Sequence, residues 1–179
     1  MTEHSQIEGV ELRRLTVHGD ARGRVLEGWR EAWTPFTVRQ LTEARAQAGV
    51  LKGLHLHYVQ WDWWRVISGR MLVGLYDARP DSATHRRSVV FEMNAESPSA
   101  LAIPPGVAHG FYALDDVEMV YLLSELYDPA DEHGIHWQSV GIDWPLAGWP
   151  IVSDRDVGLP TAEAFQWAPP AEAKPEASL

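Results

Sequence analysis

The feature that most constrains the fold is a succession of short β-like segments separated by turn residues. Candidate strands cover residues 10–17, 24–30, 36–41, 50–57, 61–68, 71–77, 87–93, 100–103, 111–114 and 118–126. Between them, residues 18–23 and 78–85 are typical of turns or loops, and Ser68-Gly69-Arg70 is typical of a tight hairpin. Helical periodicity is scarce, and one or two helical turns are expected over 42–48. Strands at this spacing predict an all-β fold, either a sandwich or a small barrel.

Length and composition predict one packed domain. The chain has 179 residues, of which 45% are hydrophobic and nine are tryptophan, which suits a single globular core. The last stretch is rich in Pro, Ala and Glu and offers little that packs, with Trp167 as the last plausible anchor. We therefore expect a domain over 1–161 and a loose tail over 162–179.

The charge and the apolar runs exclude several classes of protein. A formal net charge of −10 argues against a nucleic-acid surface, although a few arginines can still bind a small anion. No apolar run approaches the length of a membrane span, and the first residues lack the apolar core of a signal peptide. The absence of cysteine is compatible with a reducing compartment. We expect a cytoplasmic protein with neither nucleic acid nor membrane as a partner.

Histidines and an aspartate recur at a spacing that suits a metal site. The stretch from Gly49 to Gly69 has the pattern G-x5-H-x-H-x4-D-x6-G, with His55, His57 and Asp62, and PPGVAHGFYA (104–113) adds His109. Alternate residues of a strand face the same side, so the first two histidines point together. Three imidazoles and a carboxylate suit zinc, iron, manganese or nickel, and the alternative is a polar lining inside a barrel. The pattern resembles the two motifs of the cupin family.

A longer resemblance covers about residues 9–159. Its segments are DARGRVLEG (20–28), GVLKGLH (49–55), RVISGRMLVGLYDAR (65–79), IPPGVAHGF (103–111), YLLSELYDPADEHGIHW (121–137), GIDWPL (141–146) and PIVSDRD (150–156). In these segments and their order, the chain resembles the dTDP-4-dehydrorhamnose 3,5-epimerase family of cupin-fold nucleotide-sugar enzymes. The resemblance implies a jelly roll with short peripheral helices and an isomerase that uses neither metal nor other cofactor.

The resemblance also implies roles for individual residues. His55 matches the general base, Asp156 the aspartate that orients it, and Tyr121 the acid on the opposite face of the sugar. Substrate-binding positions are implied at Arg22, Glu27, Lys52, His57, Asp62, His109, Tyr127 and Glu132. The chemistry fits, because a 4-ketosugar has acidic C–H bonds beside the ketone, and inverting such a carbon needs a base and an acid on opposite faces.

The chain departs from the family pattern at several places, among them Lys52, which stands where the family has an arginine, and a shorter connection between His55 and Gln60. Asp62 stands at or beside the place of a lysine that stabilises the enolate, and Arg24 replaces a phenylalanine near the nucleotide base. An anionic Asp62 would oppose an enolate. The departures leave open the nucleotide, the sugar and the carbons that are inverted.

The function expected from the sequence follows from what His55 can do. A metal ligand has its lone pair occupied and cannot also be the free base, so we predict proton transfer at His55 and no stoichiometric metal. The expected function is epimerisation of a (d)TDP- or other NDP-4-keto-deoxysugar by a homodimer, because the tryptophan-rich sheet favours burial between subunits. The alternatives are a metal-dependent cupin isomerase or oxygenase, and a catalytically silent nucleotide-sugar binding relative.

Overall fold

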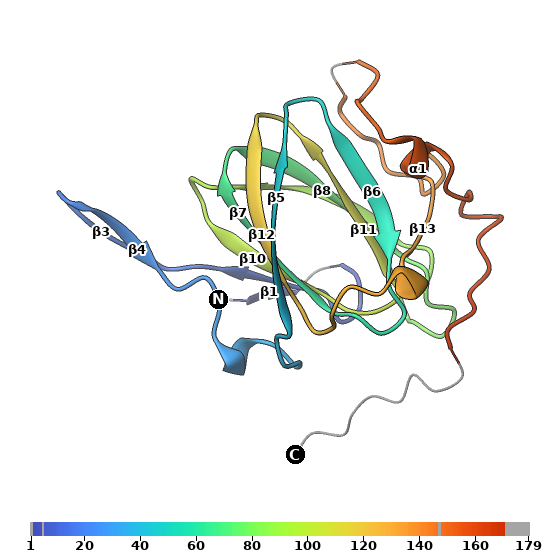
Figure 1. The fold of residues 1–179 in the computed structure, drawn as a ribbon, viewed down its shortest axis with the longest axis horizontal. Coiled ribbons are helices and arrows are strands. Elements are labelled where there is room, and N and C mark those ends of the chain that lie inside the picture. The colour runs from blue at the N-terminus through green and yellow to red at the C-terminus, as the bar shows by residue number, and fades with distance from the viewer. Residues whose placement is uncertain (1, 5, 147, 171–179) are drawn as a thin grey trace.

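Two antiparallel sheets face each other in the computed structural model, which describes residues 2–4, 6–146 and 148–170 (Figure 1). The six-stranded sheet has the spatial order β1 (Thr2–His4), β2 (Glu11–Arg14), β10 (Ser99–Ile103), β7 (Asp62–Ser68), β12 (Val117–Leu123) and β5 (Gln40–Ala46). The five-stranded sheet has the order β13 (His133–Gly134), β6 (Leu51–Leu56), β11 (Val107–Ala113), β8 (Arg70–Asp77) and β9 (Ser88–Asn94). This interleaved order confirms the predicted all-β jelly roll.

The remaining elements are short. A separate hairpin, β3 (Val17–Asp20) and β4 (Gly23–Leu26), projects away from the two sheets (Figure 1). The helical turns are η1 (Glu31–Trp33), η2 (Pro129–Asp131) and α1 (Asp154–Val157). No helix in the described part of the chain is long and apolar enough to span a membrane.

The main core lies between the sheets and follows from the two-residue period of the strands. Trp64 and Met119 come from the six-stranded sheet, and Val73 and Phe111 from the five-stranded sheet, all in one buried cluster. Trp63 points the opposite way and packs on the outer face with Ala100 and Ala102. Neighbouring residues of one strand thus serve two different cores.

Residues 135–146 and 148–167 cover the outer face of the five-stranded sheet. Ile135, Trp137 and Trp144 are buried there, and Phe165 and Trp167 pack against the same cluster. The Tyr58 hydroxyl accepts a hydrogen bond from the Ala168 N–H at 3.1 Å. The first residues of the segment expected to be a loose tail therefore contact the domain, and 171–179 lie outside the described residues.

The prediction of one or two helical turns over 42–48 was wrong. The segment lies mostly in β5, which pairs with β12 from Gln40 opposite Leu123 to Ala46 opposite Val117. Its residues alternate between exposed and less exposed, with Leu41 at 61% exposure. Glu, Ala and Arg favour helix locally, but pairing with β12 satisfies the backbone of the whole segment and overrides that preference.

Candidate active site

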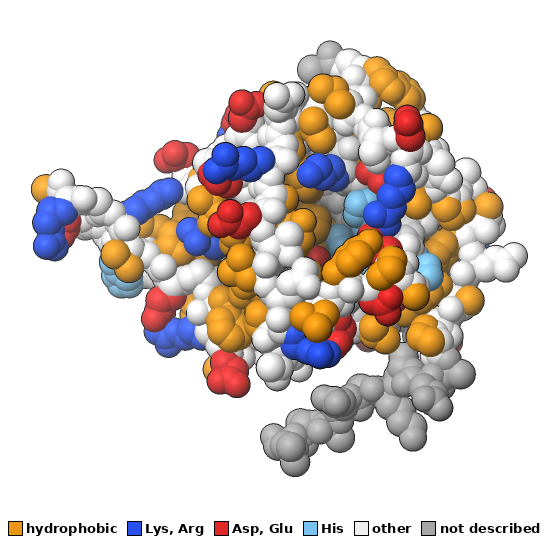
Figure 2. All heavy atoms as spheres, viewed as in Figure 1, with side chains coloured by type: hydrophobic (Ala, Val, Ile, Leu, Met, Phe, Trp, Pro, Cys, Tyr) orange, Lys and Arg blue, Asp and Glu red, His pale blue; other side chains and the backbone are white. Residues whose placement is uncertain are grey.

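The candidate site lies between the two sheets and draws on both. Leu54 and Leu56 of β6 fill the outer cluster, so the alternating His55 and His57 point the other way. His109 on β11 stands opposite His55 in the register. Figure 2 shows histidine side chains in a hollow of the surface, with Lys or Arg side chains at its edge.

His55 and Asp156 form a hydrogen-bonded pair, called the dyad below. His55 Nε2 lies 2.9 Å from Asp156 Oδ1, and Asp156 Oδ2 accepts the Gly53 N–H at 3.0 Å. Asp156 lies in the first turn of α1, where its own N–H donates to the capping Ser153 Oγ at 3.1 Å. The histidine side chain is 28% exposed and the aspartate side chain 5%. A buried carboxylate thus holds a ring that substrate can reach.

The charge of Asp156 sets the tautomer of His55. Burial raises the pKa of Asp156, but the hydrogen bonds from His55 and the Gly53 amide outweigh burial and lower the pKa overall. An ionised carboxylate only accepts hydrogen bonds, so the proton lies on His55 Nε2. The Nδ1 lone pair is then free to take a proton.

Gly53 lets β6 approach β11 closely. Its φ is +108°, a conformation that favours glycine, and an added Cβ would lie 2.7 Å from the His109 carbonyl oxygen. A side chain here would push the strands apart and displace the amide that binds Asp156. The sequence therefore needs glycine two residues before the base.

His57, Asp62 and His109 form a second group, called the triad below. All three residues are less than 10% exposed, at 7%, 4% and 5%. His57 Nδ1 donates to the Asp131 carbonyl oxygen and His109 Nδ1 to the Val107 carbonyl oxygen, both at 2.9 Å. A carbonyl only accepts, so both Nε2 atoms carry lone pairs when the rings are neutral.

The Asp62 carboxylate of the triad is held by side chains two residues before and two residues after it. It accepts the Gln60 side-chain amide at 2.8 Å and the Trp64 indole N–H at 2.9 Å. Its Oδ2 lies 3.8 Å from His109 Nε2. Burial lowers the pKa of His109 to about 4 against the opposing effect of Asp62, so this ring is neutral near neutral pH. The ligand-type atoms of the three residues all lie within 4.8 Å of one another.

Tyr121 faces the same region from β12. Its ring centroid is 6.3 Å from that of Trp64. Burial raises the pKa of its phenol, and the negative charges of Asp62 and Glu132 raise it further. Glu132 pairs with Arg155 at 2.7 Å and lies 3.7 Å from His57 Nδ1. Tyr121 thus keeps its proton at neutral pH and can donate it.

The other predicted site residues lie further out or elsewhere. Lys52 is half-buried on β6, opposite Phe111, and Tyr127 is 63% exposed after β12. Arg22 is fully exposed at the β3–β4 turn, bound to Asp20 at 2.6 Å. The structure therefore separates the hairpin arginine from the dyad and the triad within one chain (Figure 1).

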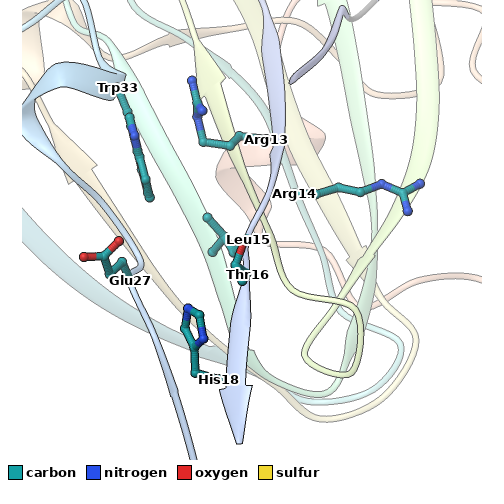
Figure 3. A pocket seen from close by; sticks show the side chains of 7 residues that line it. All are labelled: Arg13, Arg14, Leu15, Thr16, His18, Glu27 and Trp33. Atoms are coloured by element: carbon teal, nitrogen blue, oxygen red, sulfur yellow. The ribbon is translucent and has the colours of Figure 1, made fainter. Parts of the chain in front are cut away.

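Glu27 also lies apart from the dyad and the triad. It pairs with Arg30 at 2.5 Å and borders a cavity of about 170 Å³ that Arg13, His18 and Trp33 also line (Figure 3). In Figure 3 the Arg13 side chain lies near Trp33, and its guanidinium carbon is 5.0 Å from the Trp33 ring centre. This cavity lies at the root of the projecting hairpin.

Three supporting residues were missed from the sequence. Gln60, just before β7, and Trp64, on β7, flank Asp62 at two-residue spacing, and this spacing was a usable signal for both. Asp131 supports His57 through its backbone carbonyl and binds the Tyr58 N–H through its carboxylate at 2.6 Å. Every residue has a backbone carbonyl, so the residue type at 131 could not predict the hydrogen bond from His57.

Known proteins are similar to this chain in both sequence and fold. A dTDP-4-dehydro-6-deoxyglucose 3-epimerase of Streptomyces bikiniensis is 34% identical over 167 residues, covering 87% of this chain and 85% of that protein. A dTDP-4-dehydrorhamnose 3,5-epimerase of Shigella flexneri is 32% identical over 165 residues, covering 86% and 91%. The structure of ChmJ, a 3'-monoepimerase from Streptomyces bikiniensis in complex with dTDP-quinovose, superposes with a TM-score of 0.85 at 32% identity, covering 89% and 87%. The family model described as dTDP-4-dehydrorhamnose 3,5-epimerase matches residues 4–164, and the chain belongs to that family.

Proposed function

We propose that this protein is an isomerase that epimerises a nucleotide-linked 4-keto-deoxysugar, a dTDP sugar or another NDP sugar. The observation that carries the proposal is the dyad, a reachable imidazole fixed by a buried carboxylate within an epimerase-family fold. The relatives named above are epimerases of dTDP-linked sugars, and one was solved with dTDP-quinovose bound.

His55 is proposed as the base. The ketone acidifies the C–H bond on a neighbouring carbon, and the Nδ1 lone pair takes that proton while the electron pair moves onto the ketone oxygen. The resulting imidazolium is stabilised by the ionised Asp156 at 2.9 Å. The product of this step is an enolate.

Tyr121 is proposed as the acid. Its raised phenol pKa keeps it protonated, so it can give a proton to the carbon from the face opposite the base. The carbon is then inverted and the ketone restored. His55 releases its extra proton to solvent and the tyrosinate regains one, which closes the cycle.

The nucleotide is proposed to be held by residues at the edge of the site, among them Lys52, Tyr127 and Glu132. Arg22 and Glu27 stand apart from the dyad within one chain, and we propose that they serve the site of a second copy in a homodimer. The projecting hairpin supports this, since it exposes Val25 at 71% and pairs with neither sheet (Figure 1). The cytoplasm is the proposed compartment, in keeping with a cysteine-free chain.

The test is solvent-deuterium exchange into a panel of nucleotide 4-ketosugars, followed by mass spectrometry and NMR. The wild-type protein should exchange and invert at least one panel member. The His55→Asn variant should lose both, while a control variant at the exposed His85 should keep both. Binding of a ketosugar without exchange by the wild-type protein would favour the silent binding relative and contradict the proposal.

A further inference from the structure

The triad has the arrangement of a metal site that is separate from the proposed base. We propose that His57, Asp62 and His109 bind one divalent cation of the borderline class, such as Zn²⁺, Fe²⁺, Mn²⁺, Co²⁺ or Ni²⁺, and that this ion polarises the substrate ketone. The binding part stands on the residues alone, whereas the polarising part rests on the proposed function.

The first argument is the way the two imidazoles are held. Each donates Nδ1–H to a backbone carbonyl at 2.9 Å, from Asp131 and Val107. This bond fixes the tautomer and leaves the Nε2 lone pair for a cation, as the outer-sphere bonds of metal-binding histidines do. The two ring centroids are 5.4 Å apart, so the two rings are direct neighbours.

The second argument is the carboxylate. Asp62 is 4% exposed and is held by Gln60 and Trp64, and each of its oxygens keeps a lone pair for a further partner. Two imidazole nitrogens and one carboxylate oxygen leave open positions on a four- to six-coordinate ion. Those positions would take water or a substrate oxygen.

The third argument is distance. Ligand atoms on a tetrahedral ion with bonds of about 2.1 Å lie roughly 3.4 Å apart. The His109–Asp62 pair is at 3.8 Å, and all the ligand-type atoms of the triad lie within 4.8 Å of one another. Small side-chain rotations would bring all three onto one ion.

The base is not part of this group. His55 is bonded through Nε2 to Asp156 and does not belong to the metal-type cluster found among the described residues. The expectation of no metal rested on the choice between His55 as ligand and His55 as base. Because the proposed base and the proposed ligands are different histidines, proton transfer and a metal can coexist.

The charge balance gives the ion a role. The enolate needs a positive or hydrogen-bonding partner at its oxygen, yet neither triad imidazole has a proton left at Nε2, and the Asp62 charge repels an anion. A divalent ion on the triad reverses the sign of the local charge. It would then draw electron density from the ketone oxygen and ease proton removal by His55.

The first experiment measures binding without substrate. Full-length protein is stripped with a chelator, dialysed and titrated with Co²⁺ or Zn²⁺ by calorimetry, and about one ion per chain is expected. His57→Asn, Asp62→Asn and His109→Asn should each weaken binding by about 100-fold or more. Matched control variants at the exposed Asp81 and His85 should bind as wild type does. Wild-type protein that binds no ion, or triad variants that bind as tightly as wild type, would overturn the site.

The second experiment needs no variant and so stands even if a triad variant fails to fold. Pulsed EPR of wild-type protein loaded with less than one equivalent of Cu²⁺ counts the bound imidazoles. Two are expected. Three would place His55 in the site and overturn the separation of base and metal, and one or none would overturn the triad.

A third measurement separates this inference from the proposed function. Deuterium exchange into an accepted ketosugar should fall by at least about 10-fold in metal-free protein and return when Zn²⁺ or Co²⁺ is added. Equal exchange with and without the ion would overturn the polarising role. Metal binding with no exchange into any ketosugar would instead contradict the proposed function and leave the metal site standing.

Discussion

His55 of the dyad and His57 of the triad lie two residues apart and point to the same side, but different groups hold their rings. His55 is bound by a carboxylate and its side chain is 28% exposed, whereas His57 is bound by a backbone carbonyl and its side chain is 8% exposed. A charged acceptor stabilises the protonated ring, while a neutral acceptor only fixes the tautomer. The comparison teaches that the second partner, more than the histidine, decides whether an imidazole is suited to moving protons or to binding a cation.

The largest expected effect comes from removing the charge of the dyad. Asp156→Asn should lower the kcat of exchange and inversion by on the order of 1000-fold, because the amide no longer stabilises the imidazolium or fixes its tautomer. Co²⁺ affinity should stay at the wild-type value, since the triad is untouched. A variant that loses metal affinity together with activity would break the distinction between the two groups.

Tyr121→Phe should separate deuterium exchange from inversion. The enolate still forms at His55, so deuterium exchange with retention continues, but delivery from the opposite face is lost. Inversion should fall by about 100-fold, the effect of one acid–base group. NMR of the ketosugar distinguishes exchange from inversion. Wild-type inversion in this variant would mean that another group is the acid.

Gly53→Ala should affect the dyad and the triad together, because Gly53 touches both. Its amide binds Asp156, and its α-carbon faces the His109 carbonyl. A positive φ and a 2.7 Å contact predict a loss of roughly 2–3 kcal/mol in the free energy of unfolding. Denaturant unfolding measures this. A variant as stable as wild type would show that β6 and β11 can separate at little cost.

The stability contributed by the dyad should depend on pH. The pKa of Asp156 is lowered in the folded chain, so its contribution is present above the unfolded pKa and is lost as pH falls through the folded pKa. Compared with Asp156→Asn, wild type should be more stable by about 1–2 kcal/mol at pH 7, with the difference shrinking below about pH 4. Urea midpoints at both pH values test this, and a constant difference would contradict it.

The smallest expected effect is at the C-terminus. Truncation after Trp167 keeps the aromatic contact with Tyr58 and removes the hydrogen bond from Ala168 to the Tyr58 hydroxyl. The free energy of unfolding should fall by no more than about 1 kcal/mol, with activity and metal affinity unchanged. A large drop in melting temperature would place the domain boundary beyond Trp167.

The sequence was informative where side chains follow the strand period. The pattern H-x-H placed His55 and His57 on one face, and the neighbouring Trp63 and Trp64 serve opposite faces as a two-residue period requires. The strand period could not predict which residues distant in the sequence would pair. Family resemblance alone linked His55 to Asp156, and the Asp131 carbonyl that fixes His57 depends on how the η2 turn folds back.

The dyad also sets the order in which the protein becomes competent during synthesis. Its two residues are 101 positions apart, and the segment that delivers Asp156 docks through a parallel bridge between Val50 and Ile151. The strands of both sheets all precede that segment in the chain, so they are synthesised before it. A chain that stops before Asp156 therefore contains His55 without the carboxylate that orients its ring.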